Sequence, residues 1–101
     1  ITKLRDVAIA RSRDKGNHAN IGVVARSAKI YDMLVQYLTP DRVAAYFQSL
    51  RPSRVERFEL PHVHALNFVL YDVLDGGASR SLRFDTQGKL LGTALMEMEL
   101  D

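Results

Sequence analysis

The stretch from Arg11 to Gly22, RSRDKGNHANIG, carries polar groups that could bind an anion. Lys15 and the nearby arginines can pair with a carboxylate or a phosphate, and Gly16 lets the backbone approach a ligand. The glycine spacing and the Lys-Ser/Thr pair of a P-loop are missing. We therefore expect a loop over Ser12–Ala19 that either binds an anion or only closes a hairpin with solvated charges.

A second polar set lies in ELPHVHALNF, Glu59 to Phe68. His62 and His64 are two positions apart, so they would not share a face of a helix, and no third zinc ligand is evident. Asn67 lies among apolar residues, and a buried amide needs hydrogen-bond partners. We expect Asn67 to tether the Ser12–Ala19 loop to the start of a helix.

A third polar set, DGGASRSL, begins at Asp75. It is either the end of a helix followed by an edge strand, or part of the same anion pocket. No serine has the sequence context of a nucleophile elbow and the chain has no cysteine, so no catalytic residue is assigned. No metal or cofactor is expected. The candidate ligand-binding residues are Ser12, Asp14, Lys15, Gly16, Asn20, His64, Asn67, Gly76, Gly77, Arg80 and Ser81.

Hydrophobic periodicity indicates the elements that would position these groups. Strands are expected over Leu4–Ala10, Asn20–Ala25, Val55–Leu60, Ser79–Phe84 and Leu90–Leu100. Helices are expected after the cap Ser27, after Thr39-Pro40, and over His64–Leu74. Leu90–Leu100 also fits a helix, but Gly92 disfavours it by about 1 kcal/mol. This order predicts an α+β, ferredoxin-like two-layer sandwich, with helices on one face of a mostly antiparallel sheet.

Composition limits the classes of protein further. The 101 residues suit a single domain over 1–101, and the net charge of +2 is too small to indicate nucleic-acid binding. No apolar run is long enough to span a membrane, no signal peptide is evident, and the absence of cysteine fits a cytoplasmic location. The chain starts at Ile1, so a piece of a longer protein is one alternative. An exposed apolar patch is expected to support a homo-oligomer, formed by Leu91, Leu95, Met96 and Met98.

Three segments together carry a family resemblance: ARSRDKGNHANIGVVAR, FELPHVHALNFVL and GGASRSLRFDTQGKLLG. They resemble the small C-terminal domain of the acyclic terpene utilization protein AtuA family, which also occurs as a short separate protein. Asn20-Ile21-Gly22 and Ala65–Phe68 match the family pattern. Arg13 stands where the pattern has glycine, and His62 stands where it has asparagine.

The resemblance implies a ferredoxin-like fold and a role in the catabolism of branched acyclic terpenoids or related acids through coenzyme A thioesters. It also implies a large AtuA-like protein or domain as partner, and it brings no assigned catalytic residues. An accessory subunit or detached domain that helps form a ligand site is the favoured hypothesis. The alternatives are a small enzyme acting on a carboxylate or acyl-coenzyme A, with Lys15 as stabiliser and His64 or Asp14 as acid–base, and a homo-oligomeric scaffold without ligand.

Overall fold

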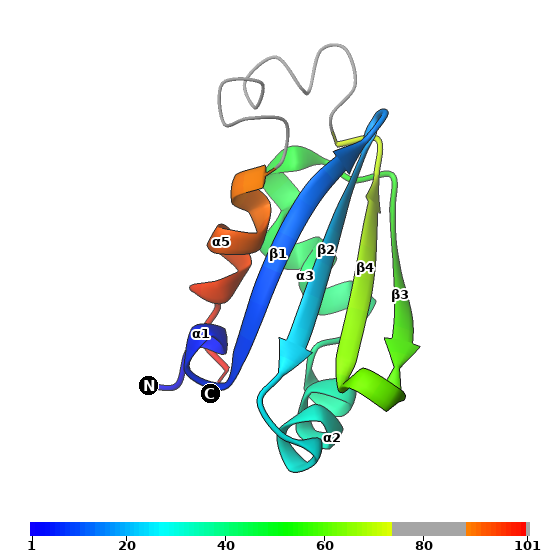
Figure 1. Cartoon of the computed structure of the whole chain (residues 1–101). Helices are drawn as coiled ribbons and strands as arrows, with labels where there is room; N and C mark the ends of the chain where they lie inside the picture. The colour runs from blue at the N-terminus through cyan, green and yellow to red at the C-terminus, as the bar shows by residue number, and fades with distance from the viewer. Residues whose placement is uncertain (74–88, 101) are drawn as a thin grey trace.

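Two β-hairpins form one four-stranded sheet. The computed structural model describes residues 1–73 and 89–100, apart from the side chains of Lys15 and Lys89. The strands are β1 (Ala8–Lys15), β2 (His18–Ala25), β3 (Arg54–Leu60) and β4 (Ala65–Tyr71). Their order in the sheet is β1-β2-β4-β3, and every neighbouring pair is antiparallel (Figure 1).

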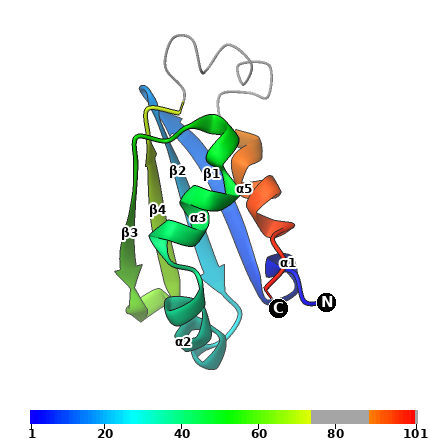
Figure 2. The same ribbon diagram turned by 180° about the vertical axis from the view of Figure 1, so that it is seen from behind.

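The helices lie together on one face of this sheet (Figure 2). They are α2 (Ala28–Tyr37), α3 (Pro40–Tyr46) and α5 (Lys89–Met96), with a short α1 (Leu4–Val7) and the 3-10 turns η1 (Gln48–Leu50) and η2 (Pro61–Val63). The order strand, strand, helices, strand, strand, helix is a cyclic rotation of the ferredoxin-like order β-α-β-β-α-β. The predicted α+β architecture with a helical layer on one face is confirmed.

Alternation along the central strands builds the core. Ile21 and Val23 of β2 and Leu66 and Phe68 of β4 are buried on the helix side of the sheet. Both predicted helix starts are confirmed, because Ser27 Oγ accepts from the Ile30 N–H (3.2 Å) and Thr39 Oγ1 accepts from the Arg42 N–H (3.2 Å). The predicted strand over Val55–Leu60 is confirmed as β3, at one edge of the sheet.

The N-terminal predictions need two corrections. The strand predicted over Leu4–Ala10 is confirmed only from Ala8, because the chain first makes α1 over Leu4–Val7, where Asp6 accepts the Lys3 N–H (2.8 Å). Ser12–Ala19 is not a long loop, because cross-strand pairing continues to Lys15 opposite His18. Only two residues remain for the turn, and Gly16 takes a φ of 65°, as the first central position of a type II′ hairpin turn requires.

Two C-terminal predictions exchange helix and strand. His64–Leu74 is not a helix, since β4 buries Leu66, Phe68 and Leu70 at period two. Leu90–Leu100 is not a strand, since α5 runs to Met96. Beyond α5, Glu99 forms a single bridge with Lys3 of the N-terminal segment. The predicted helix end at Asp75–Gly77, the strand over Ser79–Phe84 and the turn that follows lie outside the described residues.

The basis for predicted self-association was also wrong. Leu91, Leu95 and Met98 are buried in the core and Met96 is partly buried against it, so they form no exposed patch. In the described part of the chain, no helix has the length and apolar character needed to cross a membrane.

The two ends of the described chain lie side by side (Figure 1) and are joined by backbone and charge contacts. Glu97 pairs with Lys3 (2.9 Å) and Arg5 (3.2 Å). The hydrogen bond from Lys3, together with the charge of Arg5, lowers the pKa of Glu97 below its ordinary 4.5. A lowered pKa in the folded state stabilises the fold above pH 4.5, and this contribution is lost as the pH falls through the lowered value.

We therefore expect Glu97→Gln to reduce the acid sensitivity of the fold. In thermal unfolding, the melting temperatures of wild type and variant should differ at neutral pH and converge at acid pH, where the wild-type carboxylate is protonated. Glu99→Gln is the matched control, because no ion pair to Glu99 is found among the described residues. An equal difference at both pH values would contradict this role of Glu97.

Candidate functional site

The second face of the sheet carries no helix of the described chain (Figure 1). We call it the open face. Strand register places four rows of residues across it, in the order β1, β2, β4, β3. The rows are Ile9-Val24-Ala65-Leu60, Arg11-Gly22-Asn67-Phe58, Arg13-Asn20-Val69-Glu56 and Lys15-His18-Tyr71-Arg54.

The open face is apolar at one end and polar at the other. Its apolar end consists of Ile9, Val24, Phe58 and Leu60, each between 44% and 49% exposed. Toward the β1–β2 turn the face becomes polar and basic, with Arg11, Arg13 and Asn20. An exposed apolar cluster bordered by polar groups is typical of an interaction surface.

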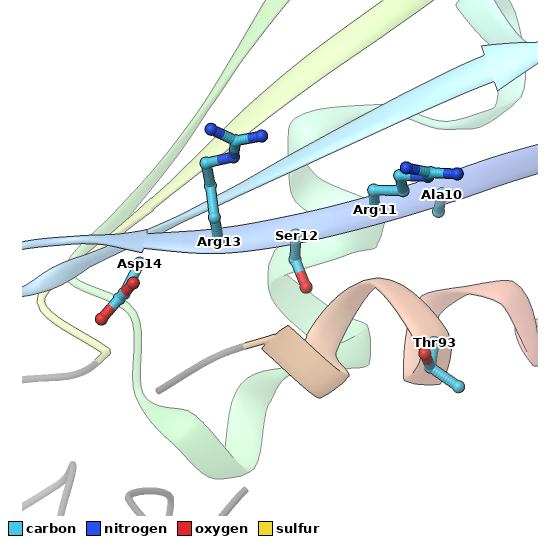
Figure 3. Close-up of a pocket in the computed structure, with 6 residues that line it drawn as sticks. All are labelled: Ala10, Arg11, Ser12, Arg13, Asp14 and Thr93. Atoms are coloured by element: carbon cyan, nitrogen blue, oxygen red, sulfur yellow. The ribbon is translucent and has the colours of Figure 1, made fainter. Parts of the chain in front are cut away.

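A hollow of about 540 Å³ lies beside β1, the edge strand next to this face (Figure 3). It is lined by Ala10–Asp14 of β1 and by Thr93 of α5. Arg11 and Arg13 project to one side of the strand, and Ser12 projects to the other side, toward α5 (Figure 3). Within residues 1–73 and 89–100, neither arginine has an ion-pair partner.

Ser12 has a structural role in this arrangement. Its Oγ accepts a hydrogen bond from the N–H of Gly92 (2.7 Å), in the first turn of α5. Ser12 therefore gives this N–H an acceptor on the edge strand β1. The hydroxyl predicted to face an anion therefore joins α5 to β1.

A polar cluster surrounds His18 at the other end of the open face. The N–H of Asp72 donates to His18 Nδ1 (3.0 Å), and the His18 ring packs against Tyr71 with centroids 4.9 Å apart. Asp72 has a φ of 64°, a strained conformation for a residue with a side chain, and its carboxylate accepts from Ser53 Oγ. Because Nδ1 accepts, neutral His18 carries its proton on Nε2.

Charged groups on β3 complete the cluster. The Tyr71 hydroxyl donates to Glu56 Oε1 (2.8 Å), and the Arg54 guanidinium lies 4.5 Å from the centre of the Tyr71 ring. Contact with Tyr71, together with the charge of Glu56, raises the pKa of Arg54. Sequence reasoning missed this cluster, because His18 and Tyr71 come together only through the pairing of β2 with β4.

The structure brings some predicted site residues together and separates others. Asn20 and Asn67 lie on the open face next to Gly22, and each is half-buried there. Asn20 is two residues before Gly22 on β2, and Asn67 is its partner on β4. Asn67 is thus not a buried tether at the start of a helix. His64 adjoins Ala25, with its carbonyl accepting the Ala25 N–H (2.8 Å), at the opposite end of the sheet from the Lys15–His18 turn.

This separation contradicts the expected meeting of the Ser12–Ala19 segment with the segment around His64. The enzyme alternative placed Lys15 as stabiliser with His64 or Asp14 as acid–base. His64 adjoins Ala25, at the far end of β2 from the Lys15–His18 pair, whereas Asp14 precedes Lys15 on β1. Asp14 lines the hollow beside β1, and Gly16 is in the hairpin turn. Beyond the described residues lie Gly76, Gly77, Arg80, Ser81 and the side chain of Lys15.

In the described ranges, no group of three or more histidine, aspartate or glutamate side chains could hold a metal ion. The open face instead offers guanidinium, amide and imidazole donors at one end and apolar side chains at the other. This chemistry suits contact with an anionic group next to an apolar one.

Comparison with known proteins agrees with the resemblance drawn from the motifs. The model of the AtuA ferredoxin-like domain matches residues 2–101. Comparisons with curated proteins and with solved structures found no significant match. Since the family model covers nearly the whole chain, the chain belongs to the AtuA ferredoxin-like domain family.

Proposed function

We propose that this chain is an accessory subunit or detached domain of an AtuA-type system and that its open face packs against a large AtuA-like protein or domain. The observation that carries the proposal is the apolar end of the open face, which no described element covers. Its four apolar side chains, from β1, β2 and β3, are each nearly half exposed, and burying them against a partner is favourable.

The joint site would take a branched-chain or terpenoid acid, or its coenzyme A thioester. The apolar end contacts the hydrocarbon part of such a ligand, and Arg11 and Arg13 contact its anionic part. The large partner supplies the remaining walls and the catalytic groups.

Capture of the partner tests this proposal. The tagged chain, expressed in its native host, should co-purify with a large AtuA-like protein. Leu60→Glu should abolish this capture, because it places a charge within the apolar end of the open face. Met33→Glu is the matched control, since Met33 is equally exposed (43%) on the helix α2.

Three results would contradict the proposal. The first is that no large AtuA-like protein is captured, and the second is that Met33→Glu reduces capture as strongly as Leu60→Glu. The third is self-association alone, with a dimer in light scattering that Leu60→Glu disrupts, which supports the homo-oligomeric scaffold instead.

A further inference from the structure

Gly22, at the centre of the open face, is a glycine that the fold does not require. A Cβ built on Gly22 meets only the side-chain oxygen of Asn67, at 3.8 Å, which is an ordinary contact. The backbone of Gly22 also has no positive φ. Glycine in the interior of a strand weakens it, and it often marks a place where a ligand approaches the backbone.

Gly92, unlike Gly22, is a glycine that the packing of the fold requires. A Cβ there would lie 2.9 Å from the carbonyl carbon of Arg11 and 2.9 Å from the nitrogen of Ser12. Packing of α5 on β1 thus explains Gly92, whereas no contact of this kind explains Gly22. Because Gly22 has no side chain, its partly exposed backbone forms the sheet surface at this point, and we call this position the floor.

The residues around this floor provide donors for an anion. Gly22 is paired with Arg11 of β1 on one side and with Asn67 of β4 on the other, and Asn20 precedes it on the same face of β2. The other arginine on the open face, Arg54, pairs with Glu56. Arg11 and Arg13 have no ion pair among the described residues, so on the open face they are the guanidinium groups available for a ligand.

The acidic side chains nearby do not occupy these donors. Asp14 alternates with Arg13 along β1 and projects to the opposite side of the strand (Figure 3). Glu56 is on the open face, but it accepts from the Tyr71 hydroxyl and pairs with Arg54. The local charge at the floor is therefore positive.

Apolar side chains adjoin the floor on its other side. Val24 follows Gly22 on the same face of β2, at about 7 Å for two residues of strand, and Phe58 lies beyond Asn67 in the same row. A ligand bound by Arg11 and the two asparagines would thus extend its next carbon atoms over Val24 toward Ile9 and Leu60.

We infer that the floor over Gly22 binds the carboxylate of an amphipathic acid, through Arg11, Arg13, Asn20 and Asn67, with the hydrocarbon chain over the apolar end of the open face. This inference rests on the proposed function for the ligand class and names the free carboxylate as the group recognised. A planar carboxylate accepts paired hydrogen bonds from guanidinium and amide groups, which gives the site its preference.

Titration with octanoate, followed by amide NMR of the chain, tests this site. Octanoate at millimolar concentration should shift the Gly22 amide and the side-chain amides of Asn20 and Asn67 in a saturable manner. Arg11→Met should weaken the affinity for octanoate by about tenfold, because one charge-assisted contact is lost. Arg54→Met is the matched control on the same face and should leave octanoate binding unchanged, because Arg54 is held by Glu56 and Tyr71.

Gly22→Val separates a binding role from a structural one. It should abolish octanoate binding by filling the floor, while the melting temperature stays the same or rises, because a β-branched residue favours a strand. Unchanged octanoate affinity in Gly22→Val would overturn the inference. Loss of folding in this variant would contradict the claim that the fold does not need Gly22.

Two further ligands define the class of compound. Octan-1-ol shares the chain without the charge, and inorganic phosphate shares the charge without the chain, so both should bind at least about tenfold more weakly than octanoate. Equal binding of octan-1-ol, or equal binding of phosphate, would overturn the assignment. Capture of the large partner is measured without octanoate, and octanoate binding is measured on the isolated chain, so failure of this inference and failure of the proposed function give different results.

Discussion

Replacement of Gly92 by alanine is expected to destabilise the fold by about 1–3 kcal/mol, although alanine is the better helix former. The Cβ would come within 2.9 Å of the β1 backbone at Arg11 and Ser12. Backbone atoms of a paired strand cannot move aside cheaply, so α5 would have to shift. Such a shift would also lengthen the hydrogen bond from the Gly92 N–H to Ser12 Oγ.

Urea unfolding measures this effect, with Thr93→Ala as the control. Thr93 is the next residue of α5 and is exposed, so alanine there should leave the unfolding free energy unchanged or slightly raised. If Gly92→Ala increased the unfolding free energy as helix propensity alone predicts, the close packing of α5 on β1 would be wrong.

Replacement of Arg57 by methionine is expected to be the second large loss, about 2–3 kcal/mol of unfolding free energy. Arg57 is on β3 and points into the helical layer, where its guanidinium donates to the carbonyls of Val35 (2.7 Å) and Leu38 (3.0 Å). These carbonyls belong to the last turn and the C-cap of α2, where carbonyl groups lack N–H donors within the helix. Methionine fills a similar volume but leaves both carbonyls without this donor.

Arg54→Met provides the comparison on the same strand. Its side chain is 65% exposed and its ion pair with Glu56 is long (3.5 Å), so this change should cost less than about 1 kcal/mol. Chemical denaturation of both variants gives the two values directly. Equal losses would mean that Arg57 contributes only as a surface charge, contrary to its contacts with α2.

Helices α2 and α3 were predictable because local signals decide them. Ser27 and Thr39 each accept the backbone N–H of the third residue of the following helix, and Pro40 fits the first turn. These contacts depend only on neighbouring residues, so the sequence contains all the information. The edge strand β3 was predictable in the same way from its alternation.

Strand β4 was mistaken for a helix because both of its faces carry apolar residues. Leu66, Phe68 and Leu70 face the core, while Val69 and Tyr71 lie on the open face. An apolar run of this kind fits the helical and the strand periods equally well. Pairing with β2 and β3 decides the matter, and those contacts are distant in the sequence.

Gly92 favoured a strand over Leu90–Leu100 where the structure has α5, for a related reason. Its cost to an isolated helix is real, but the close approach of α5 to β1 requires a residue without a side chain. A contact between positions 80 residues apart cannot be derived from helix propensity. The same limit hid the pairing of His18 with Tyr71 and Asp72.

The candidate site was predicted in part. Asn20, Asn67 and the basic character of Arg11 and Arg13 were noticed as polar chemistry, and the structure places them on one sheet surface. Their interpretation as a long loop was wrong, since the same residues alternate along two paired strands. The turn itself is limited to Gly16 and Asn17, so the ligand chemistry moves from a loop to the open face.

The central claim is that the open face is the surface by which this domain meets its partner, and methyl NMR of the complex tests it most directly. On addition of the large AtuA-like protein, the methyl signals of Ile9, Val24 and Leu60 should shift or broaden. The methyl signal of Met33, equally exposed on the helical layer, should stay unchanged. Shifts confined to Met33 and the helical layer, with unchanged Ile9, Val24 and Leu60, would contradict the account.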